Sequence, residues 1–241
     1  MLLRTEGWHT GAMASRRRRG PRTLVVIAAV AAFSVGCDAL YYKAMRKIGK
    51  EKRDILVGRV KDARESQAEA QTEFKSALER FQQIVQVDGG TLEEKYKKLD
   101  HELQRSEDRA KKVKDRIDAV RDVSKALFKE WNDELGQYSD RALRQESERE
   151  LRETKRRTDA LIASMVRAHA RVEPILQPLR DRVLFLKHNL NARALGALTK
   201  ELGSVRTNVD ELVADMQKSI AEADAFIADM ERESAADSAA R

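Results

Sequence analysis

The spacing of apolar residues over residues 56–84 most constrains the fold of this chain. Apolar or small side chains recur at alternating steps of four and three, and one polar residue interrupts the series: Leu56, Val60, Ala63, Gln67, Ala70, Phe74, Ala77, Phe81 and Ile84. A seven-residue repeat of this kind places one apolar stripe along a helix, and a second helix must cover that stripe. The segment is therefore predicted to be a long helix of a coiled coil or helical bundle.

A second helix with the same spacing is predicted to follow a short turn. The residues "DGG" at 88–90 end the first helix, and Thr91 with Glu94 has the spacing of a capping box. The heptad pattern then continues from Leu92 to Tyr138, with Leu135 one place out of register. Because the connection is so short, the two helices are expected to pack as antiparallel neighbours.

The two prolines of "VEPILQP" predict a further turn near 173–178. Proline in a helix interior costs about 3 kcal/mol, so Pro174 or Pro178 is expected to open the last helix. The predicted helical domain spans residues 54–231, with turns near 88–90 and 173–178. A disordered tail is predicted over 232–241, where the residues are small and polar.

One stretch of the last helix is apolar on every side. Val183, Leu184, Phe185 and Leu186 point in all directions around a helix, so a simple two-helix rod would leave some of them uncovered. A third helix or a partner is needed to cover Leu184 and Phe185. The predicted fold is therefore all-α, an elongated antiparallel bundle of three to four long helices. The candidate core or partner patch comprises Val183, Leu184, Phe185, Leu186, His188 and Leu190.

The first 37 residues have the organisation of an export signal. Four consecutive arginines are followed by an apolar run of 13 residues, Leu24 to Gly36, which is too short to span a bilayer. The run ends in "SVGC" and resembles a bacterial lipobox, which implies cleavage before Cys37 and acylation of its thiol. Ser34 departs from the leucine usual at that position. We therefore expect a signal peptide over residues 1–36, with Met13 as an alternative start.

Cys37 is the only cysteine, and three other interpretations of it stay open. It could be a small buried thiol, a nucleophile without a histidine nearby in sequence, or part of an uncleaved signal anchor that would have to bury Asp38. The lipid attachment is favoured. If the resemblance to lipoproteins holds, Asp38 directly after the cysteine implies retention at the inner membrane, by the sorting rule of enteric bacteria.

A basic segment follows the cysteine, and residues 37–53 are assigned to the anchor and this segment. Its cations are Lys43, Arg46, Lys47, Lys50, Lys52 and Arg53, against the single Glu51. Near a lipid anchor such cations contact anionic headgroups at about 1 kcal/mol each. The alternative is a solvated helix face.

The rest of the chain offers no chemistry that the sequence can identify. The net charge of +7 is concentrated in residues 1–37, which hold six arginines and one glutamate, so nucleic-acid binding is not favoured. A single cysteine and scattered histidines provide no disulfide framework, and no HExxH motif or phosphate-binding loop is present. We expect no enzyme activity, no metal and no cofactor.

Three segments together resemble a known family. These are "YYKAMRKIGKEKRDILVGRV" after the cysteine, "LFKEWNDEL" at 127–135 and "VLFLKHNLNARA" at 183–194. They are similar to an uncharacterised family of bacterial helical lipoproteins, a domain of unknown function, over about residues 38–231. The resemblance implies a location in a Gram-negative envelope and no reaction or ligand.

The expected function is that of a lipid-anchored scaffold or spacer on the periplasmic side of the envelope. The expected partners are the membrane, through Cys37, and an envelope protein or a second copy of the chain. The alternative is a membrane-binding or membrane-remodelling helical bundle, in which residues 183–186 become exposed on a lipid surface.

Overall fold

The computed structural model describes residues 52–86 and 89–239, and the regular structure in these residues is helical. The elements are α2 (Lys52–Gln86), α3 (Leu92–Glu134), the short 3₁₀ helix η1 (Leu135–Gln137), α4 (Arg141–Ala170), α5 (Glu173–His188) and α6 (Ala192–Ala239). They lie within one compact unit, Lys50–Arg241. The all-α prediction is confirmed: four long helices pack antiparallel, and the shorter α5 follows α4.

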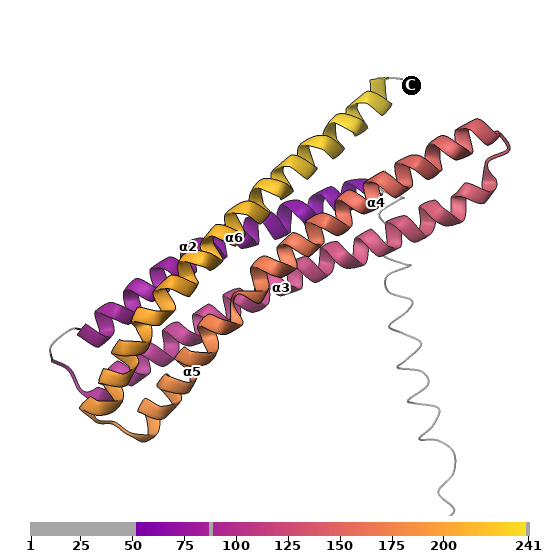
Figure 1. Ribbon diagram of the computed structural model, residues 1–241. Coiled ribbons are helices and arrows are strands. Elements are labelled where there is room, and N and C mark those ends of the chain that lie inside the picture. Colours follow the sequence, from indigo (N-terminus) through magenta and orange to yellow (C-terminus); the bar gives the residue numbers. More distant parts are fainter. Residues whose placement is uncertain (1–51, 87–88, 240–241) are drawn as a thin grey trace, which may run out of the picture. The chain divides into compact units, whose positions relative to one another are not determined.

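The helices form a closed four-sided arrangement (Figure 1). Helix α2 packs against α3 and α6, while α4 and α5 each pack against α3 and α6. Ion pairs give the direction of the chain: Arg157 of α4 contacts Glu233, Arg171 contacts Glu211, and Arg182 of α5 contacts Glu201. As the residue number rises from Arg157 to Arg182, the number of the contacted residue on α6 falls from 233 to 201. Helices α4 and α5 therefore run in the same direction, antiparallel to α6.

Pro174 therefore marks a break in a continuing direction, and the expected turn at 173–178 is not where the chain reverses. Pro178, the alternative start predicted for the last helix, lies inside α5. Helix α4 ends at Ala170, and α5 begins at Glu173 with Pro174 in its first turn. A proline there loses no helical hydrogen bond, because backbone N–H groups of the first turn have no partner within the helix. The chain reverses at 189–191 instead, between α5 and α6.

The turn between α2 and α3 has the chemistry that its sequence predicts. Gly89 and Gly90 both have positive φ, at 100° and 73°, which favours glycine. Thr91 then caps α3: its hydroxyl accepts from the Glu94 N–H at 3.2 Å, and the Glu94 carboxylate accepts from the Thr91 N–H at 3.0 Å. The predicted capping box is confirmed, and it fixes where α3 begins.

The predicted apolar stripes form the core, with one slip near the end of α2. Leu56, Val60 and Phe81 are almost completely buried, and so is the one polar residue of the series, Gln67. Val85 is buried in place of the predicted Ile84, which stays partly exposed. A helix of 3.6 residues per turn drifts against a strict seven-residue repeat, so the buried position moves by one residue along a long helix.

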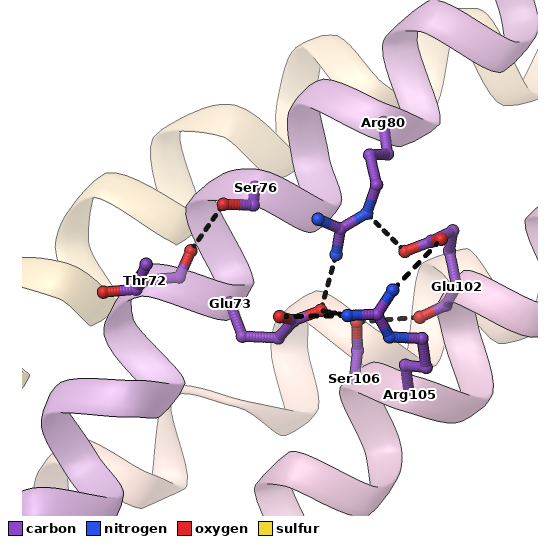
Figure 2. Close-up of polar contacts among 7 residues, drawn as sticks. All are labelled: Thr72, Glu73, Ser76, Arg80, Glu102, Arg105 and Ser106. Carbon is purple, nitrogen blue, oxygen red and sulfur yellow. Dashed lines mark hydrogen bonds and ion pairs between the residues drawn. The ribbon is translucent and has the colours of Figure 1, made fainter.

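A cluster of four alternating charges joins α2 to α3 (Figure 2). Arg80 lies 2.5 Å from both Glu73 and Glu102, and Arg105 lies 3.2 Å from Glu73 and 3.6 Å from Glu102. Each arginine thus contacts both carboxylates. The arrangement matches only one alignment of the two helices, and it supports the register that the apolar stripes set.

The last helix begins and ends later in the chain than predicted. We expected it to end near residue 231 and the tail 232–241 to be disordered, but α6 continues to Ala239. Two ion pairs hold its last turns against neighbouring helices: Lys61 with Glu231 and Arg157 with Glu233, both at 2.6 Å. Alanine, frequent in this segment, also has the highest intrinsic helix propensity.

Candidate interaction site

The end of α5 presents apolar side chains to solvent. Val183 and Leu186 lie in the core, but Leu184 is 53% exposed, Phe185 47% and Leu190 46%. No further helix of the described residues covers Leu184 and Phe185, because α5 packs on α3 and α6 through its opposite face. The alternative, that a partner covers them, stays a prediction. We call residues 182–193, which hold the last turns of α5 and the reversal into α6, the tip.

The two asparagines of the tip are used to end one helix and begin the next. The Asn189 N–H donates to the carbonyls of Phe185 and Leu186, and its side-chain amide donates to Phe185 O at 3.1 Å. The Asn191 side chain accepts from the Ala194 N–H at 2.9 Å, as an N-cap does. The reversal therefore satisfies these side chains locally, and Leu190 between them is held outward.

The charges of the tip are all positive. Lys187 and Arg193 are exposed, and Arg182 contacts Glu201 of α6 at 3.3 Å. The side chain of His188 is exposed as well. No acidic residue occurs between Asp181 and Glu201. The tip thus combines exposed apolar side chains with the exposed cations Lys187 and Arg193. The patch predicted from the sequence included neither of these two cations.

Part of the predicted headgroup-binding segment belongs to the bundle. Lys52 contacts Glu130 of α3 at 2.6 Å, and the Arg53 guanidinium lies 5.4 Å from the centre of the Trp131 ring. These two cations therefore stabilise the start of α2 against α3. Cys37 and the cations Lys43, Arg46, Lys47 and Lys50 lie outside the described residues.

A cavity of about 390 Å³ lies at the break between α4 and α5, and His169 is among the residues that line it. Arg180 crosses its edge and contacts Glu107 of α3 at 2.7 Å and Glu173 at 3.1 Å. Within the described residues, His169 Nδ1 is buried and has no hydrogen-bond partner. This cavity was not predicted, because the break near Pro174 was expected to reverse the chain rather than to leave α4 and α5 in line.

Burial lowers the pKa of His169 below its usual value of 6.5, and the positive charge of Lys114 adds to this, while Asp118 opposes it. The folded protein therefore prefers the neutral imidazole. Because the unfolded chain binds the proton more readily, the free energy of unfolding is expected to fall as the pH drops below about 6.5. The effect is reduced by the partial exposure of the ring.

Replacing His169 by glutamine is expected to remove this part of the pH dependence. Urea titrations of the wild type and His169→Gln at pH values from about 7.5 to about 5.5 measure it. His188→Gln, a change at an exposed histidine, is the matched control and should keep the wild-type slope. An unchanged slope in His169→Gln would contradict the assignment.

The described helices offer no evident metal site. Among residues 52–86 and 89–239, no three His, Cys, Asp or Glu side chains are grouped so that they could hold an ion. In the same residues, no helix combines the length and the apolar character that a membrane crossing requires.

Comparison with known proteins identifies a family. The family model described as "Protein of unknown function (DUF2959)" matches residues 41–230, which is most of the chain and includes both the start of α2 and the tip. No curated protein matches the chain, and neither does any solved structure. The chain therefore belongs to the DUF2959 family, whose members have no assigned function.

Proposed function

We propose that the protein is a non-enzymatic, lipid-anchored scaffold or spacer on the periplasmic side of the cell envelope. Cys37 is the proposed site of lipid attachment, after removal of residues 1–36. The basic residues that follow, Lys43 to Lys50, hold the chain close to anionic headgroups. The bundle then separates the anchored end from the tip.

The observation that supports a spacer is that the chain enters the bundle at one end and the tip lies at the other. Helix α2 begins at Lys52, beside Glu130 of α3. The tip lies at the end where α2 meets α3 (Figure 1). Near this end of α2, Gln82 accepts from Arg206 of α6 at 3.0 Å. The 35 residues of α2 span about 52 Å at 1.5 Å per residue. A membrane that holds the chain before residue 52 would thus be separated from the tip by about this length of bundle.

The packing of the described helices supports a rigid body. Polar contacts join α2 to α3 from Lys52–Glu130 to the charge cluster around Arg80. Helix α2 also contacts α6 through Arg64 and Asp224 at 2.9 Å. At the His169 cavity, Arg180 is engaged by two carboxylates, which favours a structural role for these charges over a catalytic one. A spacer needs such stiffness and needs no reactive group.

A labelling experiment tests the proposed location. Lys125 on α3 is exposed, so Lys125→Cys provides a second thiol on the surface of the bundle. A membrane-impermeant maleimide added to intact spheroplasts is expected to label Lys125→Cys. The wild type is the control and should stay unlabelled even after lysis, because its only thiol carries the lipid. Labelling of the variant only after lysis would contradict a periplasmic location.

A second candidate function is membrane remodelling by the bundle itself, which the exposure of Leu184 and Phe185 favours. In that case the helices would separate on a lipid surface and release vesicle contents. Dye leakage from anionic vesicles at low salt would support it, whereas binding without leakage would favour the spacer.

A further inference from the structure

The exposed apolar residues of the tip are placed to enter a lipid surface end-on. Leu184 lies four residues before His188, the last residue of α5, which is about 6 Å along the helix axis. Interfacial protein segments bury their apolar side chains about 5 to 10 Å into the headgroup and acyl boundary. Leu184, Phe185 and Leu190 could thus all reach that boundary while Val183 and Leu186 stay in the core.

The charge of the tip selects the type of surface. Lys187 and Arg193 are exposed on either side of the reversal, and Lys200 is exposed about two turns further along α6. Residues 182–200 include no acidic residue, so Lys187, Arg193 and Lys200 give this stretch a net positive charge. The nearest exposed carboxylates at this end of the bundle belong to Glu93 and Glu94, in the first turn of α3. Each cation close to an anionic membrane strengthens binding about fivefold.

Another exposed apolar residue of the bundle has charges of both signs around it. Leu143 on α4 is 58% exposed, but its neighbourhood mixes charges: Asp140 caps the helix, and Arg144 pairs with Glu148 at 3.0 Å. The combination of exposed Leu and Phe side chains with cations alone distinguishes the tip. Leu143 is therefore a matched control.

A protein partner fits the tip less well than a lipid surface does. A stable protein interface involves about 20 to 30 residues on each side and buries about 800 Å² of each partner. The tip comprises twelve residues, 182–193, with three large exposed apolar side chains at the narrow end of a bundle. Insertion into lipid requires no such area, because the lipid surrounds each side chain.

We propose that the tip docks on the headgroup region of an anionic lipid surface, so that the spacer bridges two membranes. Bridging rests on the proposed function, because it requires the lipid anchor at the other end of the bundle. The docking of the tip is argued from residues 182–193 alone. The bundle remains folded in this state, which separates docking from remodelling.

Vesicle bridging tests the docking directly. The full-length protein, purified from host membranes, is reconstituted into immobilised donor vesicles of phosphatidylcholine alone, which hold it by its N-terminal region. Fluorescent acceptor vesicles with about 30% phosphatidylglycerol are then added at about 0.05 M salt, where charges are weakly screened. Capture of these acceptors is expected to exceed capture of pure phosphatidylcholine acceptors at least about tenfold, and to fall at about 0.5 M salt.

Two double variants of the tip are expected to lose this capture at least about tenfold: Leu184→Ser with Phe185→Ser, and Lys187→Glu with Arg193→Glu. The matched controls, Leu143→Ser and Lys125→Glu with Arg141→Glu, should capture like the wild type. Thermal melts followed by circular dichroism check that each variant is folded. The tip variants and the control variants all keep the basic residues near Lys52. Capture that depends on those residues would therefore be the same in both sets.

Absence of capture by the folded wild type, or equal capture by tip and control variants, would overturn the proposal. A photocrosslinker at position 184 that reacts with one protein in cells and never with lipid would overturn it in favour of a protein partner. The mass of the same preparation reports the anchor independently. Capture without a lipid adduct would refute the lipid anchor and support the docking of the tip. An adduct without capture would support the anchor and refute the docking.

Discussion

Replacing Phe81 by alanine is expected to lower the free energy of unfolding by about 3 to 5 kcal/mol. Phe81 is 1% exposed and belongs to the apolar stripe of α2, near the turn into α3. Removing the ring loses its transfer free energy and leaves a cavity that packed helices fill only in part. Urea denaturation followed by circular dichroism measures the loss.

Phe185→Ala is the matched control, because it removes the same side chain from a position that is 47% exposed. Its cost is expected to stay below about 1 kcal/mol, as for most surface substitutions. Similar losses in both variants would mean that Phe185 is covered in solution. The tip could then not be the free surface that docking requires.

Replacing Gln67 by leucine together with Ser219 by alanine is expected to raise the free energy of unfolding by about 1 to 3 kcal/mol. Both side chains are fully buried, and the Ser219 hydroxyl donates to Gln67 Oε1 at 3.1 Å. Within the described residues Gln67 Nε2 has no partner, so the pair leaves one donor unsatisfied in the core. Apolar replacements of similar size remove that cost.

Gln71→Leu is the control for this change. Its side-chain amide donates to the Val213 carbonyl at 3.2 Å, so leucine would leave that carbonyl without this donor. A loss of about 1 kcal/mol is expected. If the Gln67→Leu and Ser219→Ala variant proved less stable than the wild type, the core would contain a partner for Gln67 that the described contacts omit.

The seven-residue pattern and the capping chemistry were sufficient to predict the paired helices. Leu56 to Phe81 gave the buried face of α2, and Gly89, Gly90 and Thr91 gave the turn, because these residues act through local geometry. The break at Pro174 was misplaced as a reversal. A proline shows that a helix is interrupted, but the direction of the next helix depends on the tertiary packing against α3 and α6.

The candidate site was only partly predictable for the same reason. The sequence singled out residues 183–186 as apolar on all sides, and burial of all four was expected. The structure buries Val183 and Leu186 and exposes Leu184 and Phe185, because α5 lies on the outside of the bundle at its end. Burial of His169 likewise depends on packing at the α4–α5 break, which no local pattern encodes.

The proposed spacer depends most on how the chain is attached at Cys37. The direct measurement is the intact mass of the protein extracted from membranes of its host, beside that of Cys37→Ser. We expect a wild-type chain that begins at Cys37 and carries a diacylglyceryl adduct, and a variant without that adduct. A wild-type chain that retains residues before Cys37 and has no adduct would contradict the lipid anchor, and with it the spacer.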